Sequence, residues 1–342
     1  MDTVDRALMQ ELAADCRKSY QAIARKLNLA PNTVRNRMNK LREQGVLLGF
    51  DVFISMEMMG AEHVAGYVLT DGAENVIEFM KRIATHPGVA EIYRTGDMRY
   101  EYWAIVSGAS EALGFERFLQ NLDDVKIVEL RPIEFLFPNM PPEYFMNSRG
   151  KKVIFTKSQL QVLRCLFDNG RMPVSQIAQS TGFTARHVRK ILRELKEGGG
   201  VHFHGQFDIF KLGGMEYRLK IRYDGAQISG QEIITGIYNK YPIAFWWASI
   251  TTNEPLVDIG LIINSPGAAV PIINEVKSTS YSQLVEDYVT YPRVVKGNAP
   301  PRVRLAEILI EAGLLDSDAR IWGSTGGNKI SEFLQKKENN QF

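Results

Sequence analysis

The sequence predicts an α+β fold in which two tandem copies of a winged helix-turn-helix domain are each followed by a ferredoxin-like βαββαβ domain. Three observations support this prediction. The chain repeats itself at an offset close to half of its 342 residues. A basic amphipathic helix stands near the start of each copy, and the segment after it alternates strand and helix patterns in the same order both times.

Length and composition fit several folded domains, since 45% of the residues are hydrophobic and 23% are charged. The net charge of +2 is nearly neutral, so attraction for nucleic acid has to come from local clusters. Cys16 and Cys165 fall in apolar helical patterns, and the chain start lacks a signal-peptide layout. With no apolar stretch long enough for a membrane span, we expect a cytoplasmic protein without a membrane partner.

The internal repeat has a constant offset of 154 (177 − 23) over the helical region. The matching residues are Ile23, Val34, Leu41 and Gly45 in the first copy and Ile177, Val188, Leu195 and Gly199 in the second. A later echo, residues 50–53 against residues 207–210, has an offset of 157 (207 − 50). The difference predicts three added residues in the glycine-rich neighbourhood of residues 198–200.

The repeat and the composition also give domain boundaries. Residues 138–142 are rich in proline, which removes backbone donors and should end the last strand of the first copy. We predict a helix-turn-helix domain at residues 1–50, a ferredoxin-like domain at 51–138, a proline-rich linker at 139–152, a second helix-turn-helix domain at 153–206, a second ferredoxin-like domain at 207–292 and a C-terminal tail with a short helix at 293–342.

The third helix of the first copy, residues 32–44, follows a tight turn at residues 28–31. Val34, Met38 and Leu41 share one face and should point inward. The outward positions are Asn32, Thr33, Arg35, Asn36, Arg37, Asn39 and Lys40. Arginine can donate two hydrogen bonds to guanine, asparagine can pair with adenine and lysine attracts phosphate, so this set predicts contact with a DNA major groove.

The second copy repeats the design with different outward residues. Val188, Leu192 and Leu195 are predicted to point inward. The predicted DNA-contacting positions are Thr184, Arg186, His187, Arg189, Lys190 and Arg193. Because these residues differ from those of the first copy, two DNA half-sites read by one chain should differ in sequence. The alternatives are that each basic face is only solvated, or that the second module has become a packing element.

The rest of each copy gives the order βαββαβ. The predicted strands are residues 64–70, 89–95, 100–107 and 126–137 in the first copy and residues 217–223, 244–251, 256–264 and 284–290 in the second. This arrangement places both helices on one face of an antiparallel sheet. We expect apolar residues on the open faces, and face-to-face packing of two such sheets within one chain or between two chains.

The run of residues 20–38, with Gly45, Val46, Gly49 and Phe50, closely resembles the feast/famine regulators of the Lrp/AsnC family. The following βαββαβ unit is similar to the RAM-type sensor domain of that family. The resemblance implies a transcriptional regulator that binds double-stranded promoter DNA and responds to an amino acid or another small-molecule effector. Because one chain holds two copies, we expect them to pair within the chain, and we also expect a homo-oligomer. Members of that family usually carry one such unit per chain.

The hairpin at Thr95, Gly96 and Asp97 looks like the Gly-Asp effector loop of the family, which implies that Gly96 and Asp97 bind the effector. The alternative is an ordinary tight turn, which glycine beside aspartate favours sterically. The second copy reads Thr-Asn-Glu-Pro at residues 252–255, where that loop would stand. Effector binding is therefore expected in the first copy alone.

Two other interpretations stay open. The resemblance also reaches siroheme decarboxylases, which would want histidine and arginine around a large pocket. Candidate residues for such a site are His86, Arg94, Arg99, Tyr100 and Tyr102 in one copy and Tyr241, Trp246 and Trp247 in the other, and they form no motif. The second interpretation is an interaction protein whose basic helices bind no nucleic acid.

We predict no catalytic residue, no metal and no cofactor. His202 and His204 alternate along an extended segment, but no cysteine or carboxylate stands nearby at a ligand spacing. Contact with DNA phosphates is the better interpretation of this pair. The sequence also lacks a glycine-rich phosphate loop followed by lysine and a serine nucleophile elbow.

Overall fold

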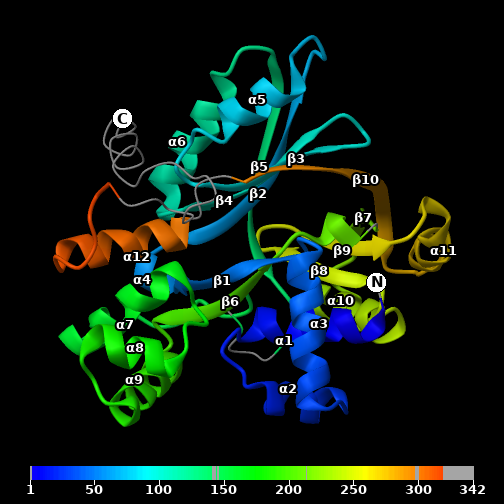
Figure 1. The fold of residues 1–342 in the computed structure, drawn as a ribbon. Coiled ribbons are helices and arrows are strands. Elements are labelled where there is room, and N and C mark those ends of the chain that lie inside the picture. The colour runs from blue at the N-terminus through cyan, green and yellow to red at the C-terminus, as the bar shows by residue number, and fades with distance from the viewer. Residues whose placement is uncertain (1, 141–143, 145, 213, 297–299, 319–342) are drawn as a thin grey trace. The chain divides into compact units, whose positions relative to one another are not determined.

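The computed structural model describes residues 2–140, 144, 146–212, 214–296 and 300–318 (Figure 1). The chain divides into two compact units. The first, here called the helical unit, comprises Met1–Gly60, Pro142–Lys211 and Ala299–Phe342, and the second, the barrel unit, comprises Ala61–Pro141 and Leu212–Asn298. Each unit therefore takes one part from each copy of the repeat. In the part of the chain that the structure describes, no helix is both long and apolar enough to cross a membrane.

The helical unit contains two three-helix modules. They are built from α1 (Thr3–Ala14), α2 (Tyr20–Leu27) and α3 (Pro31–Glu43), and from α7 (Lys157–Asp168), α8 (Val174–Thr181) and α9 (Ala185–Gly198). A strand follows each module, and these strands, β1 (Leu47–Ile54) and β6 (Val201–Phe207), pair antiparallel as a two-stranded ribbon. Short helices, α4 (Met56–Met59) and η1 (Ile209–Leu212), come after the strands. The predicted winged helix-turn-helix architecture is confirmed in both copies.

Matching residues end the middle helix of each module. Asn28 closes α2 with φ 54°, and Gly182 closes α8 with φ 73°, so both take the left-handed conformation. They are equivalent positions at the offset of 154 (182 − 28). The next helices then start on local signals, with Pro31 in the first turn of α3 and the Thr184 hydroxyl accepting from the His187 amide at 3.2 Å in α9. The turn that orients each third helix therefore follows from local sequence.

The barrel unit confirms the order βαββαβ twice. The first half consists of β2 (Glu62–Thr70), α5 (Val76–Ile83), β3 (Val89–Thr95), β4 (Tyr100–Val106), α6 (Gly108–Gln120) and β5 (Val125–Phe135). The second half consists of β7 (Met215–Tyr223), α10 (Gly230–Lys240), β8 (Phe245–Thr251), β9 (Leu256–Ile263), the short η2 (Pro266–Ala268), α11 (Val270–Lys277) and β10 (Ser282–Lys296). In Figure 1, α5 and α6 lie beside the strands of the first half, and α10 and α11 beside those of the second.

The two four-stranded sheets join by their edges and close into one barrel, in the order β10-β3-β4-β2-β5-β8-β9-β7. One seam pairs β5 with β8, with Ile133 opposite Thr251. The other pairs β10 with β3, with Thr290 opposite Thr95, and it extends β10 to Lys296, beyond the predicted end at residue 290. Closure leaves no open sheet edge at either seam. The two sheets thus meet within one chain, joined at their edges as well as facing one another.

The helices pack on the outside of the barrel over apolar cores. Phe79, Tyr100 and Phe115 belong to the core of the first half, and Leu219 and Phe245 to the core of the second. Because side chains alternate along a strand, the neighbours of these core residues point into the barrel. Buried among those neighbours are the charged residues Glu101, Arg218 and Lys220. The expectation of apolar open faces was wrong, since the barrel interior is lined with charges.

The predicted tail helix is present as α12 (Pro300–Glu311) and packs against β1, α4 and α7 in the helical unit. Arg302 of α12 and Asp51 of β1 form a buried ion pair with 2.9 Å between Nη1 and Oδ1. The Arg302 guanidinium also lies 4.1 Å from the Phe167 ring centroid. Residues 319–342 of the predicted tail and prolines 141 and 142 of the predicted linker lie outside the described residues.

Candidate functional site

Helix α3 turns its apolar face inward and leaves most of its polar face open. Val34, Met38 and Leu41 are each at most 2% exposed, as the spacing predicts. The exposed outward residues are Asn32, Arg35, Asn36, Asn39 and Lys40, and Thr33 is half-buried. Arginine guanidinium and asparagine amide groups thus lie along the exposed side of α3, and the apolar residues on its other side anchor the helix to the module. This is the chemistry needed to meet base edges in a major groove.

Arg37 is the exception on this helix. Its Nη1 donates to Asp2 Oδ2 at 2.6 Å and to Asp5 Oδ1 at 2.7 Å, both at the start of α1. The Arg37 side chain is 30% exposed. Two ion pairs to α1 hold its guanidinium against the module. Arg37 therefore serves to position α3 in this structure, and the sequence pattern alone could not distinguish it from Arg35.

Helix α9 presents a second basic face. The exposed positions are Thr184, Arg186, His187, Arg189, Lys190 and Arg193, which are all those predicted. The Thr184 hydroxyl already serves as the helix cap, and His187 packs edge-on against Phe183 with 5.0 Å between ring centroids. Of the predicted inward residues, Leu192 is only half-buried and Ile191 is buried in its place. The buried face of α9 therefore contains Val188 and Ile191, three residues apart, and not the predicted pair Val188 and Leu192, four residues apart.

The two modules are joined through equivalent backbone contacts. The Cys16 amide donates to the Phe203 carbonyl at 3.0 Å, and the Gly170 amide donates to the Phe50 carbonyl at 2.7 Å. These bonds relate Phe50 to Phe203, an offset of 153 (203 − 50). The echo at 157 therefore does not mark equivalent residues, and the predicted three-residue addition was wrong. Residues 209–212 form η1 and correspond instead to α4.

The histidine pair of β6 lies within the helical unit. His204 Nδ1 is 3.2 Å from the Ala13 carbonyl oxygen, and its ring stacks on Phe53 with 5.6 Å between centroids. Burial lowers the pKa of His202 to about 4, so this ring is neutral at pH 7. The neutral, half-buried ring of His202 carries no charge that would attract a phosphate, and the ring of His204 packs on α1. This geometry gives the predicted phosphate contact of the pair little support, and the contact stays a prediction.

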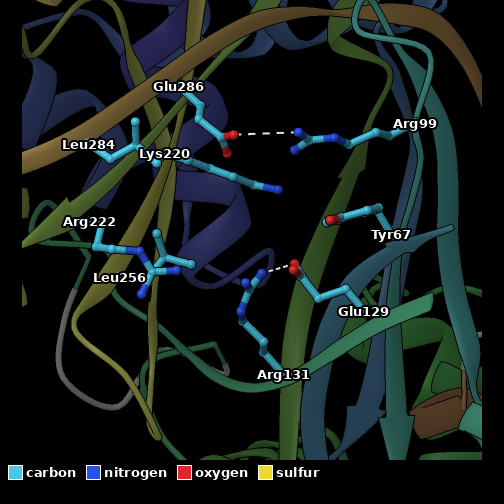
Figure 2. A pocket seen from close by; sticks show the side chains of 9 residues that line it. All are labelled: Tyr67, Arg99, Glu129, Arg131, Lys220, Arg222, Leu256, Leu284 and Glu286. Atoms are coloured by element: carbon cyan, nitrogen blue, oxygen red, sulfur yellow. Dashed lines mark hydrogen bonds and ion pairs between the residues drawn. The ribbon is translucent and has the colours of Figure 1, made fainter. Parts of the chain in front are cut away.

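A pocket of about 160 Å³ lies inside the barrel unit and receives side chains from both halves (Figure 2). Four cationic residues line it, namely Arg99, Arg131, Lys220 and Arg222. The other lining residues are Tyr67, Glu129, Leu256, Leu284 and Glu286. Figure 2 shows the four cationic side chains around a common space, with Lys220 and Arg222 from β7, Arg131 from β5 and Arg99 from the hairpin before β4. The pocket can therefore bind a small molecule through charge.

The Gly96 and Asp97 hairpin contacts the second half of the barrel and one pocket residue. The Gly96 amide donates to the Val289 carbonyl of β10 at 2.8 Å. Asp97 Oδ2 lies 3.2 Å from Arg99 Nε, and Arg99 lines the pocket. The corresponding loop of the second half supplies Glu254, whose carboxylate binds Arg222 at 2.6 Å and also Arg131. Each loop thus contributes a carboxylate that holds pocket arginines.

Next to the pocket, the barrel interior contains a buried charge cluster. Lys220 Nζ lies 2.5 Å from Glu101 Oε1, and Arg218 Nη1 lies 3.1 Å from Glu101 Oε2. Arg218 Nε also donates to Asp258 Oδ1 at 3.0 Å. Burial raises the pKa of Glu101, which the neighbouring Lys220 opposes. Lys220 belongs to both the cluster and the pocket wall, so the two are electrostatically connected.

Sequence reasoning missed most of the pocket residues, although one signal was present. Strand β7 alternates cationic and apolar residues, with Arg218, Lys220 and Arg222 at every second position. On a strand this alternation puts three cations on one face. An apolar open face is incompatible with that pattern. The pattern could therefore have indicated a charged barrel interior before the structure was known.

The residues considered for a tetrapyrrole site are divided between the two faces of the barrel wall. His86 packs outside against Phe115 and Phe118, with 4.6 and 5.0 Å between ring centroids. Tyr100 and Tyr102 belong to the outer core. Arg94 forms an ion pair with Glu74, and the Tyr241 hydroxyl donates to Glu275. Arg99 lines the barrel pocket, and Trp247 donates to Glu216. These residues do not converge on one site.

Comparison with known proteins identifies both modules. An AsnC-type helix-turn-helix domain model matches residues 1–42, and a winged helix-turn-helix DNA-binding model matches residues 155–199. An uncharacterized HTH-type transcriptional regulator of Pyrococcus furiosus is 36% identical over 106 residues, which are 31% of this chain and 70% of the relative. The HTH-type transcriptional regulator Ptr1 of Methanocaldococcus jannaschii is 27% identical over 174 residues, 51% of this chain and 99% of that protein.

A solved structure resembles the chain over nearly its whole length. The crystal structure of the siroheme decarboxylase NirDL aligns with a TM-score of 0.56 and 11% identity, covering 91% of this chain and 99% of that one. At this identity the likeness concerns the fold alone. The fold of this chain therefore recurs in another protein over nearly the whole of both chains.

Proposed function

Because the chain belongs to the Lrp/AsnC family of transcriptional regulators, we propose that it binds promoter DNA sequence-specifically and responds to a small metabolite such as an amino acid. The chain carries two helix-turn-helix DNA-binding domains. The observation that carries the proposal is the exposed polar face of α3, anchored by Val34, Met38 and Leu41. Asn32, Arg35 and Asn36 occupy its N-terminal half, the part of a recognition helix that reads bases.

The second module supports a bipartite DNA target. Arg189 occupies the position equivalent to Arg35 at the offset of 154 (189 − 35), and both are exposed. The neighbouring outward residues differ, with His187 where the first copy has Thr33 and Lys190 where it has Asn36. Base contacts set sequence preference, so α3 and α9 would read unlike half-sites. We therefore expect a non-palindromic operator bound by a single chain.

Pairing of the two copies within the chain replaces contacts that two separate units would otherwise have to make. The β1 and β6 ribbon joins the modules, and the β5–β8 and β10–β3 seams close the barrel. One polypeptide can therefore present two DNA-binding heads without a partner. Further self-association stays a prediction, and light scattering of the purified chain at several concentrations checks it.

The response to a metabolite is proposed for the barrel pocket. Asp97 of the family-like hairpin pairs with Arg99, which lines the pocket. The same hairpin is bonded through Gly96 to Val289 of the second half. A ligand that competes for Arg99 would change the contacts of this hairpin. This connection supports the pocket as the effector site, with Gly96 and Asp97 acting beside the ligand.

We propose that the chain performs no catalysis. Its relatives are named as regulators, and at 11% identity the decarboxylase likeness carries no chemistry to this chain. The pocket of about 160 Å³ is also smaller than the roughly 300–1,000 Å³ of pockets that hold drug-sized ligands. A tetrapyrrole would need more space than this pocket provides. Adding siroheme to the purified protein checks this alternative, because binding would change the visible absorbance of the tetrapyrrole.

The DNA-binding proposal is tested by selecting duplexes from a random library with the full chain, then measuring fluorescence anisotropy on the selected sequence. Affinity should fall steeply between about 50 and about 200 mM salt, since binding to phosphates releases counterions. Arg35→Ala should weaken binding by roughly 1–3 kcal/mol, the cost of one base-specific contact, and relax the preference in one half-site. Arg189→Ala should do the same in the other half-site.

Arg164→Ala provides the matched control, because Arg164 is on α7 of the same unit and pairs with Asp168 on the helix surface. This variant should bind the selected duplex as the wild type does. Failure to enrich any sequence, together with absent or salt-independent binding, would favour the interaction-protein interpretation instead.

A further inference from the structure

We propose that the barrel pocket binds one compact dianion per chain, a small dicarboxylate or a phosphate group, in preference to a zwitterionic amino acid. This inference rests on the proposed metabolite response and specifies the chemical class of the ligand. It is carried by the charge, the pairing and the volume of the pocket lining. The residues come from both halves of the barrel, so a ligand there contacts both copies of the repeat.

The lining carries more positive than negative charge. Arg99, Arg131, Lys220 and Arg222 face the pocket, against only two lining carboxylates. Neither carboxylate is free to hold an ammonium group, because Glu129 pairs with Arg131 and Glu286 lies 3.4 Å from Arg99. An amino acid would bring a positive charge into a space whose negative groups are already engaged. A ligand with two negative charges meets no such obstacle.

Lys220 and Arg222 provide the two positive charges that the lining does not compensate. Their partners, Glu101 at 2.5 Å and Glu254 at 2.6 Å, are not among the lining residues. These carboxylates contact the cations from outside the pocket and so hold the head groups in place. An ammonium has three N–H donors and a guanidinium has five, so each cation retains donors beyond the one that its partner uses. Two preorganised cations next to each other favour a dianion.

The volume limits the ligand to a small molecule. The pocket of about 160 Å³ is close to an engineered cavity of about 150 Å³ that binds benzene. Leu256 and Leu284 contribute an apolar side, which suits a short hydrocarbon link between two charges. Inorganic phosphate or a three-carbon dicarboxylate fits these dimensions.

The site should exist once per chain, because equivalent positions of the two halves line the same pocket. In register, Tyr67 of β2 pairs with Glu101 and Glu129, and Lys220 of β7 pairs with Asp258 and Glu286. Lys220 therefore stands where the first half has Tyr67. Both residues line this one pocket, so exchanging the halves gives the same site again and not a second site.

The experiment is isothermal titration calorimetry of the full chain with four probes: malonate, inorganic phosphate, neutral malonamide and L-alanine. We expect malonate or phosphate to bind with one site per chain, and malonamide and L-alanine to give no saturable heat. Binding of malonate alone identifies a dicarboxylate site, and binding of phosphate alone identifies a phosphate site. Arg222→Gln should weaken the bound anion at least about tenfold, which corresponds to roughly 1.4 kcal/mol.

Arg131→Gln is the second variant and should weaken binding similarly. Arg222 is the more exposed of the two, at 36%, so Arg222→Gln keeps the test available if Arg131→Gln fails to fold. Arg82→Gln is the matched control, since Arg82 on α5 pairs with Asp123 and Asp124 away from the pocket lining. It should bind the anion as the wild type does.

The inference is overturned if neither anion binds, or if both pocket variants fold and bind with wild-type affinity. Saturable binding of L-alanine without malonate or phosphate would also overturn it, while leaving the metabolite response itself intact. The DNA experiments are independent of these titrations. Absent DNA binding with normal anion binding would reject the proposed function and keep the anion site.

Discussion

Arg17 and Arg171 occupy equivalent positions in the two copies, 154 residues apart (171 − 17), and each donates to the backbone of the other module. Arg17 Nη1 donates to the Gly170 carbonyl at 2.7 Å, and its Nη2 donates to the Met172 carbonyl at 3.1 Å. Arg171 Nη1 donates in return to the Cys16 carbonyl. This reciprocal exchange holds the two modules against each other and so fixes the separation of α3 and α9.

Replacing both arginines with methionine should loosen this junction while keeping most of the side-chain bulk. Each lost charge-assisted hydrogen bond costs roughly 1.5–3 kcal/mol, so the free energy of unfolding of Arg17→Met with Arg171→Met should fall by at least about 2 kcal/mol. Affinity for the complete operator should also fall, because the heads no longer keep one spacing. Urea denaturation and anisotropy with the complete duplex measure the two effects.

A duplex with one half-site scrambled separates spacing from general damage. The double variant should bind that duplex as the wild type does, since each module still reads its own half-site. Arg164→Met is the control for both measurements. Equal losses on the complete and the scrambled duplex would mean that the junction does not set the spacing.

The sequence predicted those parts of the fold that depend on residues close together along the chain. Periodic apolar residues such as Val34 and Met38 define a helix face, and Ser19, Pro31 and Thr184 act within one turn of their helix starts. Barrel closure depends instead on pairings such as Thr290 with Thr95, between strands far apart along the chain. Such pairings leave no periodic pattern, so edge-to-edge closure could not be derived in advance.

The same distinction holds for the candidate site. Outward residues of α3 and α9 follow from helix geometry, and the structure exposes nearly all of them. The role of Arg37 depends on Asp2 and Asp5 in another helix, and the pocket depends on Arg131 and Lys220 from opposite halves. These relations are tertiary. Residues 207–210 match residues 50–53 in sequence, but the hydrogen bonds between the modules make other positions equivalent. A sequence match within a repeat therefore does not guarantee structural equivalence.

Arg37→Ala should act differently from Arg35→Ala. Arg37 binds Asp2 and Asp5 of α1, so its removal should lower the free energy of unfolding by up to about 1 kcal/mol, the usual limit for a surface ion pair. Arg35 is exposed, and its removal should leave stability unchanged while DNA affinity falls. Thermal denaturation at low and high salt measures this, because salt screens the Arg37 pairs and should reduce its effect. Identical stability profiles for the two variants would contradict the positioning role.

Arg302→Met should lower the free energy of unfolding far more than the same change at Arg304, two residues further along α12. Arg302 and Asp51 are both buried, and removing one partner of a buried pair costs roughly 3–5 kcal/mol because the other charge is left behind. Arg304→Met is the matched control, since Arg304 is 38% exposed and pairs with Glu307 on the same helix. Its cost should stay within about 1 kcal/mol. Adding Asp51→Asn to Arg302→Met should recover part of the loss, and urea denaturation of the three variants checks the order.

Glu216 should make stability depend on pH near neutrality. Its carboxylate accepts from Trp247 Nε1 at 2.5 Å and from Thr290 Oγ1 at 3.0 Å inside the barrel. Burial raises the pKa of Glu216 to about 7 from an ordinary value of 4.5, and the nearby Glu91 and Asp258 act in the same direction. Between these two values the folded protein holds a proton that the unfolded chain has released. The free energy of unfolding should therefore fall as pH rises through this window and level off above pH 7.

Glu216→Gln removes this titration while keeping the side-chain shape. The variant should be more stable than the wild type at about pH 8, by up to roughly 3 kcal/mol for a shift of this size, and the difference should shrink toward about pH 5. Other titrating groups, including the histidines, act equally on both proteins and cancel in the difference. Glu78→Gln, on the exposed side of α5, should follow the wild type at both pH values. A stability difference between Glu216→Gln and the wild type that does not change with pH would show that Glu216 does not retain its proton in the folded barrel.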